Sequence, residues 1–332
     1  MTQPSAGPSG RAFYIYDRDI FGRGPSFYEP GAAAMFGRVD DGRVEFCHAI
    51  RINNYGCVDD VPYRERDGRP QLRIVAVGDS FTANLDSAQH WPALLEERLR
   101  WVCAAPVQVF NLGLTGAGPS NWMALAGLVG RLQPDVLVMT CYDGILRRPR
   151  IRFVTRPGPR RFECHYGHPM FSTKTVGVCD PRFPNLSAEA LRDYGHMLDE
   201  EQRRHRRTLL GRLRSSLCHR SGHAGTLVRY NQRAVGRMLE WAPSVIIALA
   251  PSLRTLNEGG AADPQRAFLI QAAAARRVTV VDLARSLQGS DAQCAYTASS
   301  HHWNAVGNAI VAQALVEPVL DAVRGVEVRV TA

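Results

Sequence analysis

Lysine is nearly absent from this sequence of 332 residues, in which Lys174 is the only example. The formal net charge of +9 therefore comes almost wholly from arginine, which concentrates between Arg147 and Arg220. Guanidinium groups bind phosphate and carboxylate well, so this segment is either a solvated helix face and loop or a contact for an anionic partner. Such a partner would be a carrier-protein phosphopantetheine, a nucleotide or an acidic glycan. No nucleic-acid-binding motif accompanies the charge, which argues against specific nucleic-acid recognition.

Long apolar runs are also missing. No run approaches the roughly 18 residues that span a bilayer, and the first ten residues hold no apolar block of a signal peptide. We therefore expect no membrane span and a cytoplasmic protein. The eight cysteines show no C-x-x-C pair, and Cys164, His165, His168 and Cys179 match no standard zinc spacing, so we expect free thiols, no metal and no cofactor.

Five short runs rich in Val, Ile and Leu alternate with helix-like segments. This alternation predicts a three-layer αβα sandwich with a five-stranded parallel sheet, similar to flavodoxin. The expected strands cover residues 72–77, 107–110, 135–139, 244–249 and 278–282. The expected helices cover residues 91–102, 120–132, 264–277 and 304–319.

Two segments lie outside this alternation. Residues 1–70 lack helical periodicity and contain β-like pieces, so we expect an N-terminal extension that wraps a core domain of residues 71–325. Residues 147–220 form an insertion between the third and fourth strands. Its first part, residues 147–184, is predicted as loop and its second, residues 186–217, as a charged helix; together they would cover the strand ends as a lid.

Polar motifs follow the predicted strands, and active sites in such sheets lie at the carboxyl ends of the strands. Ser80 comes directly after the first strand, in a Gly-Asp-Ser turn that would expose it to a cleft; as an isolated feature it would equally suit a helix cap. Gly116 lies in the glycine-rich loop after the second strand, where a backbone N–H can reach an oxyanion. Near the C-terminus, a histidine before Asn304 can face the serine, and Asn304 is suited to cap the last helix.

These motifs resemble the SGNH/GDSL hydrolases. The resemblance rests on Gly-Asp-Ser at 78–80, on Asn-x-Gly-x-x-Gly at 111–116 and on His-Trp-Asn-x-x-Gly at 302–307, and it covers residues 50–145 and 240–322. It implies a serine esterase with Ser80 as nucleophile, His302 as general base, and the backbone N–H groups of Ser80 and Gly116 in the oxyanion hole. His301 is the less suitable base, because the family's histidine lies two residues before the asparagine. Asp79, His301 and Trp303 are expected to line the substrate pocket.

The sequence departs from the family at two positions. Tyr142 stands where the family has the asparagine that completes the oxyanion hole, so Tyr142 is the expected third donor. Ser299 and Ser300 stand where the family has the aspartate that orients the histidine, which leaves Asp143 and Asp291 as candidates for a displaced acid.

Two hypotheses remain open from the sequence. In the first, a Ser-His dyad or an atypical triad hydrolyses or transfers an acyl group from a small or carrier-linked ester, possibly anionic. In the second, an altered SGNH-like fold binds an anionic ligand or a partner without cleaving esters.

Overall fold

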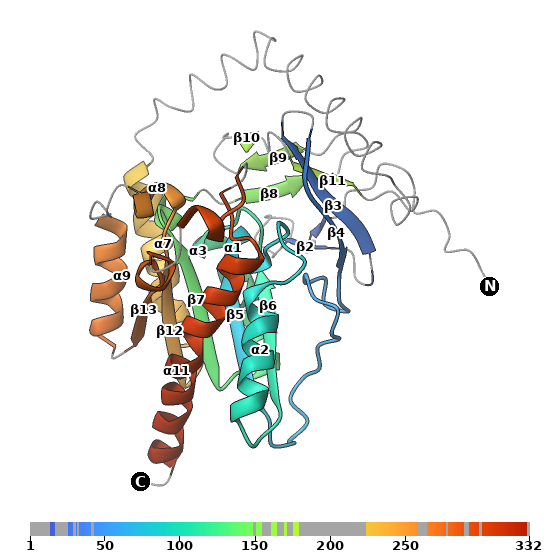
Figure 1. Cartoon of the computed structure of the whole chain (residues 1–332). Helices are drawn as coiled ribbons and strands as arrows, with labels where there is room; N and C mark the ends of the chain where they lie inside the picture. Colours follow the sequence, from blue (N-terminus) through green and yellow to red (C-terminus); the bar gives the residue numbers. More distant parts are fainter. Residues whose placement is uncertain are drawn as a thin grey trace, which may run out of the picture.

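The computed structural model describes residues 14–16, 26–28, 31, 33–40, 43–148, 151–154, 161–164, 169–170, 175–178, 224–257, 264–276, 278–288, 292–298 and 301–330. Its centre is a parallel sheet of five strands in the order β13-β12-β7-β5-β6 (Figure 1). The strands are β5 (Leu72–Gly78), β6 (Val107–Gly113), β7 (Val136–Tyr142), β12 (Ser244–Ala250) and β13 (Thr279–Asp282). The predicted α/β fold and all five predicted strands are confirmed.

Helices cover both faces of this sheet. One face packs against α2 (Trp91–Val102), α10 (Leu283–Gln288) and α11 (Ala305–Val330), and α2 and α11 lie in front of the sheet in Figure 1. The other face packs against α3 (Pro119–Trp122), α4 (Ala126–Leu132), α7 (Ala224–Met238) and α9 (Pro264–Ala274). Apolar side chains therefore point to both sides of each central strand, as in a sheet buried between two helical layers.

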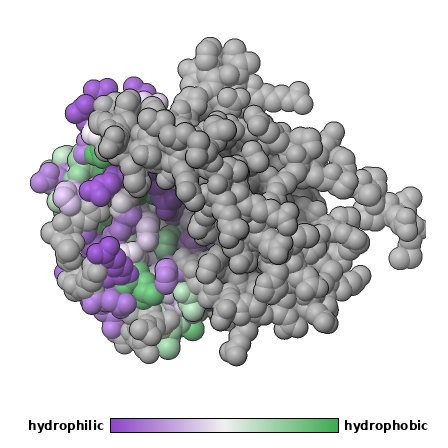
Figure 2. Space-filling model, turned by 90° about the horizontal axis from the view of Figure 1, so that it is seen from above, coloured by the Kyte–Doolittle hydropathy of each residue, from purple (hydrophilic) through white to green (hydrophobic). Residues whose placement is uncertain are grey.

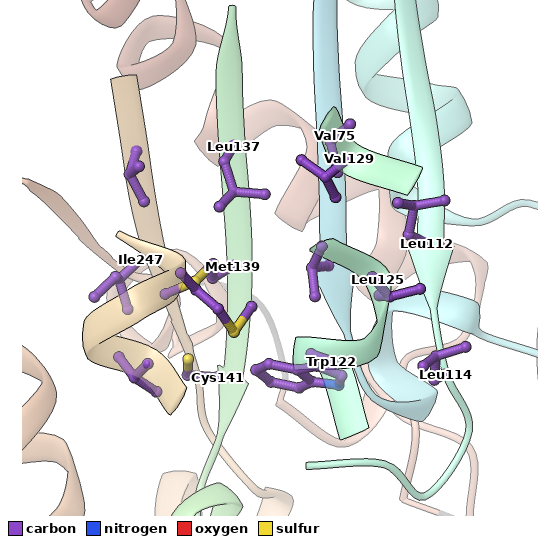
Figure 3. Close-up of a cluster of buried hydrophobic side chains, with 14 of the residues drawn as sticks. Val75, Leu112, Leu114, Trp122, Leu125, Val129, Leu137, Met139, Cys141 and Ile247 are labelled. Carbon is purple, nitrogen blue, oxygen red and sulfur yellow. The ribbon is translucent and has the colours of Figure 1, made fainter. Parts of the chain in front are cut away.

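The second of these faces is shown in Figure 3. Trp122, Leu125, Val75 and Met139 belong to one cluster of side chains on this face, and all four are fully buried. The 3-10 turn η1 (Met123–Leu125) separates α3 from α4, whereas the sequence predicted one continuous helix over residues 120–132. Residues three apart lie on one side of a 3-10 turn, so this break lets Trp122 and Leu125 both face the sheet.

The helix ends differ from prediction by a few residues at α9 and by eleven residues at α11. The α11 helix continues past residue 319 to Val330, although Pro318 lies inside it. The short helix α8 (Leu253–Asn257) after β12 lies in a segment predicted as loop.

The insertion contains strands where the sequence predicted loop. These are β8 (Ile151–Val154), β9 (Arg161–Cys164), β10 (Pro169–Met170) and β11 (Thr175–Val178). The strands have only two to four residues and Pro and Gly surround them, so no alternating pattern develops. The predicted helix at residues 186–217 lies outside the described residues.

The N-terminal segment joins this insertion through a sheet. Strand β3 (Ala33–Asp40) pairs with β4 (Arg43–Arg51) on one side and with β11 on the other, while β1 (Tyr14–Tyr16) pairs with β2 (Ser26–Tyr28). The β-like pieces expected around residues 43–52 are thus one strand, β4. The pairing of β3 with β11 joins parts of the chain that are more than a hundred residues apart, which local patterns do not encode.

One helix in the described part of the chain is long and apolar enough to cross a membrane by length and composition, namely Ala305–Arg324 within α11. Its Val311, Leu315 and Val319 are fully buried against the sheet and α2. This packing is that of a core helix in an α/β fold.

His90 makes the stability of α2 sensitive to pH. Its side chain caps α2 by accepting a hydrogen bond from the Ala93 N–H, and burial lowers the pKa of His90 although Asp59 and Asp60 raise it. A histidine whose pKa is lowered by folding loses stability as the pH falls below its unfolded value, because protonation is easier in the unfolded chain. Between pH 7.5 and 5.5, we expect the free energy of unfolding to fall by about 1 kcal/mol more in the wild type than in His90→Asn, which keeps an acceptor. Urea titrations at the two pH values measure this difference, and equal losses would contradict it.

Candidate active site

Ser80 lies at the carboxyl end of the central strand β5, where the four-residue helix α1 (Ser80–Ala83) begins. The Asp79 side chain caps this helix by accepting a hydrogen bond from the Phe81 N–H at 3.0 Å. Helix α1 ends at Asn84, whose left-handed backbone (φ 38°) turns the chain back. Ser80 is half-buried while Phe81, Thr82 and Ala83 are buried, so the serine is the residue of α1 that is open to solvent.

The glycine-rich loop after β6 lies close to α1. A Cβ at Gly113 would come within 2.1 Å of the Ala83 nitrogen, so only glycine lets β6 approach α1 this closely. Gly116 has φ 74°, a conformation that favours glycine. Within the described part of the chain, the backbone N–H groups of Ser80 and Gly116 have no hydrogen-bond partner, as expected of groups that bind a ligand oxygen.

The C-terminal motif places His302 directly before the buried Trp303. Asn304 caps α11, since its Oδ1 accepts hydrogen bonds from the N–H groups of Val306 and Gly307 at 2.9 and 3.1 Å. The predicted cap is therefore confirmed. A Cβ at Gly307 would come within 2.2 Å of the Ala295 carbonyl oxygen, which explains why glycine occupies this position.

His302 joins Ser80 to a carboxylate that the sequence analysis did not select. Its Nε2 lies 2.8 Å from the Ser80 Oγ, and its Nδ1 lies 2.8 Å from the Asp86 Oδ2. The side chain of Asp86 is 8% exposed and that of His302 is 26% exposed. An ionised Asp86 accepts the Nδ1 hydrogen, which leaves the Nε2 lone pair facing the serine hydroxyl.

Further contacts hold the serine segment against the histidine segment. The Asn84 Nδ2 donates to the Trp303 carbonyl oxygen at 3.2 Å. The Phe81 ring lies edge-on to the Trp303 ring, with centroids 4.8 Å apart, and its centroid is 5.0 Å from that of His302. These contacts fix the position of the imidazole relative to α1.

The acid candidates from the sequence do not occupy this position. The Asp143 Oδ2 instead accepts a hydrogen bond at 2.7 Å from the N–H of Ser252, the residue directly before α8. Asp291, Ser299 and Ser300 lie outside the described residues. His301 is exposed with a left-handed backbone (φ 57°), and the contacts to Ser80 and Asp86 are both made by His302.

Two residues expected in the substrate pocket are buried instead. Trp303 is 0% exposed in the apolar core beneath α11, so it does not line a pocket. Asp79 is also 0% exposed and serves as the α1 cap. Cys141 is a buried thiol, as expected, and burial together with the nearby Asp79 raises its pKa to about 12.

Tyr142, the third oxyanion donor expected from the sequence, packs against α1. Its ring stacks on the Phe81 ring with centroids 4.5 Å apart. Burial and the neighbouring Asp79 raise the pKa of Tyr142, so the phenol is neutral.

Strand β4 of the N-terminal segment contacts the loop before the base. The Ala298 N–H, four residues before His302, donates to the Glu45 Oε1 at 2.6 Å. Burial lowers the pKa of His48, also on β4, although the Leu85 backbone and the Asp86 charge raise it. The N-terminal segment thus contributes to the placement of the loop that carries the base.

Figure 2 looks down on the end of the molecule where α1 lies, and the described surface in view carries hydrophilic side chains with hydrophobic ones between them. No group of three His, Cys, Asp or Glu side chains suited to a metal ion occurs within the described ranges. The side chains of Cys164, His165, His168 and Cys179, considered above for zinc, lie outside the description. Cys57, Cys103, Cys141 and Cys294 are free thiols.

No family model and no curated protein matches the chain. The solved structures that it matches include lipolytic enzymes and an esterase. A lipase/acylhydrolase from Enterococcus faecalis is 13% identical, with 75% of this chain and 95% of that one covered and a TM-score of 0.40. A member of the lipolytic G-D-S-L family from Veillonella parvula is 15% identical, with coverages of 74% and 97% and a TM-score of 0.39. An acetyl xylan esterase is 12% identical, with coverages of 75% and 100% and a TM-score of 0.43.

These matches span about three quarters of the chain at low sequence identity.

Proposed function

We propose that this protein is a serine hydrolase that cleaves an acyl ester, with Ser80 as nucleophile, His302 as general base and Asp86 as the acid that orients it. The observation that carries the proposal is the continuous contact from Ser80 Oγ through His302 to Asp86, with 2.8 Å at each step. A serine, an imidazole and a buried carboxylate in this sequence of contacts form the arrangement that activates a hydroxyl for attack on a carbonyl carbon.

The proposed reaction proceeds in two acyl-transfer steps. Ser80 Oγ bonds to the ester carbonyl carbon while His302 Nε2 takes the hydroxyl proton, and the carbonyl oxygen becomes an oxyanion. His302 then gives this proton to the leaving alcohol as the ester C–O bond breaks, which leaves an acyl-enzyme. Water, deprotonated by His302, attacks the acyl carbon and releases the acid and free Ser80. An alcohol or amine acceptor in place of water would make the same site a transferase.

Asp86 has a defined part in this scheme. Its carboxylate keeps the hydrogen of His302 on Nδ1 and stabilises the imidazolium that forms during each step. The backbone N–H groups of Ser80 and Gly116 are proposed to bind the oxyanion, since both are without a partner among the described residues. The hypothesis of a binding protein without esterase activity rested partly on a missing acid, and the position of Asp86 favours hydrolysis over it.

The substrate is proposed to be a small or carrier-linked acyl ester. The arginines of the insertion beyond residue 147 would favour a substrate or carrier with a negative charge. Of these, Arg148 is half-buried in the described part of the chain.

Hydrolysis of p-nitrophenyl acetate tests this proposal. We expect saturable release of p-nitrophenol by the wild type and a loss on the order of 10⁴-fold or more in kcat for Ser80→Ala, because removing the nucleophile of such a triad leaves only binding and oxyanion stabilisation. Thermal melts establish that Ser80→Ala remains folded. Activity equal to wild type in Ser80→Ala would rule out Ser80 as the nucleophile, and an inactive wild type would rule out the esterase.

A further inference from the structure

One arginine lies beside the proposed nucleophile with its donors directed at a buried carboxylate. Arg148 follows the 3-10 turn η2 (Ile145–Arg147) in the connection after β7. Its Nη2 lies 3.5 Å from the Oδ2 of Asp79, the residue before Ser80. The Arg148 side chain is 26% exposed, whereas that of Asp79 is 0% exposed. One side of the guanidinium therefore contacts the buried Asp79, and the Arg148 side chain remains partly open to solvent.

The other end of this side chain lies against the glycine-rich loop. A Cβ at Gly118 would come within 2.6 Å of the Arg148 Cβ, so the start of the arginine side chain occupies the space that glycine leaves. Gly118 is two residues after Gly116, and Asp79 is one residue before Ser80. The Arg148 side chain thus extends from the loop of one proposed oxyanion donor to the turn of the other.

The backbone of Arg148 is fixed on both sides. Its N–H donates to the Ile145 carbonyl oxygen at 3.1 Å, and its own carbonyl oxygen accepts from the Asn231 Nδ2 at 2.9 Å. Asn231, on α7, is 0% exposed and also accepts the Ser120 N–H through its Oδ1. A side chain with such a fixed base loses less conformational entropy when it binds a ligand.

The Arg148 guanidinium also compensates the charge of the buried Asp79 carboxylate. The Asp79 Oδ2 is buried and has no hydrogen-bond partner among the described residues, so the Arg148 charge at 3.5 Å is its nearest described compensation. Burial raises the pKa of Asp79, and Arg148 is the largest influence that lowers it. The Arg148 charge also acts to lower the pKa of Tyr142, which burial raises. No hydrogen bond from the Arg148 guanidinium occurs within the described ranges, which leaves its N–H donors available to a ligand.

We propose that Arg148 supplies the third donor to the oxyanion that forms at Ser80, and that Asp79 holds its guanidinium in place. This inference rests on the proposed esterase function. The Tyr142 ring stacks on Phe81, and six residues further along the same connection after β7 offers the charged donors of Arg148. A charged donor suits an oxyanion better than a neutral amide, because a hydrogen bond between ionised groups is stronger.

Arg148→Met tests the inference, with Arg147→Met as the matched control. Arg147 is the neighbouring arginine and is exposed, so its substitution removes the same charge without the contact to Asp79. With the neutral ester p-nitrophenyl acetate, we expect kcat to fall about 100-fold in Arg148→Met with KM within a few-fold of wild type, since one oxyanion donor is worth about this much. Arg147→Met should retain wild-type kcat. Adding guanidinium ion to Arg148→Ala should restore part of the lost rate.

Several outcomes separate the possibilities. Wild-type kcat in Arg148→Met would overturn the role of Arg148 and leave the esterase intact, provided that Ser80→Ala is inactive. A loss confined to p-nitrophenyl hemisuccinate, and expressed in KM, would mean that Arg148 binds an anionic group of the substrate instead. If Arg148→Met does not fold, the thermal melt will show it. In that case Arg148→Lys, which keeps the charge, is compared with a folded Arg148→Gln. Arg148→Lys should retain the higher kcat, and equal kcat values would overturn the inference. An inactive wild type would remove both proposals together.

Discussion

Asp86→Asn is expected to lower kcat for p-nitrophenyl acetate by about 10⁴-fold. An asparagine amide placed at the Nδ1 of His302 can donate a hydrogen bond, which favours the tautomer with hydrogen on Nε2. That tautomer has no lone pair facing the Ser80 Oγ, which lies 2.8 Å from Nε2. The substitution also removes the charge that stabilises the imidazolium. Steady-state kinetics of the purified variant measure the effect.

Asp143→Asn is the matched control for this experiment. Asp143 was an acid candidate from the sequence near the end of the third strand, yet its carboxylate accepts a hydrogen bond from the Ser252 N–H. An asparagine oxygen can still accept this bond, so we expect kcat to remain close to wild type. If Asp143→Asn is inactive while Asp86→Asn is active, the assignment of the acid is wrong. Thermal melts exclude loss of the fold, which matters because Asp86 is largely buried.

His302→Ala should lower kcat by a factor on the order of 10⁴ to 10⁶, because the serine then lacks a group to take its proton. His301 provides a close control, since it is the adjacent residue and has the same titratable group. It is exposed, and the 2.8 Å contacts to Ser80 and Asp86 come from His302. We therefore expect His301→Ala to keep most of the activity.

The pH profiles of the two variants give a second comparison. His301→Ala should keep the decline in kcat/KM that accompanies protonation of the base, whereas any residual activity of His302→Ala should lack it. The reverse pattern would show that His301 is the base and that the contact between His302 and Ser80 is not used.

Local patterns in the sequence were sufficient to predict the central sheet. Buried strands such as β5 and β7 are rich in Val, Ile, Leu and Met, and the amphipathic helix α2 follows its predicted range. Such patterns depend on residues close together in the chain. The pairing of β3 with β11 depends on distant residues, and it was not predicted.

The acid of the site also depends on the path of the chain, which local sequence patterns do not reveal. The family's aspartate lies two or three residues before the histidine. The motifs therefore predicted the acid in residues 291–300, just before His302. Asp86 lies six residues after Ser80, and only the turn at Asn84 brings its carboxylate to the other side of the imidazole. Asp86 is one of the carboxylates close in sequence to the serine helix, but the sequence alone does not distinguish Asp86 from the other acids.

Trp303 and Asp79 were expected in the pocket because they flank the proposed catalytic residues in sequence. Neighbours of an active residue often point the other way, and here both side chains are fully buried. Trp303 packs under α11, and Asp79 caps α1. Arg148 was visible in the sequence only as one of many arginines, since its contact with Asp79 depends on the path of the chain after β7.

The most direct test of the central claim is the site of covalent modification by a fluorophosphonate. The phosphorus of this reagent is attacked by an activated serine, fluoride leaves, and a stable ester remains on the oxygen. Mass spectrometry of the digested protein should locate the adduct on Ser80 in the wild type, and labelling should be lost in Ser80→Ala and strongly slowed in Asp86→Asn. Labelling that is unchanged in Ser80→Ala, or the absence of any adduct on the folded wild type, would contradict the proposal that Ser80, His302 and Asp86 form a working triad.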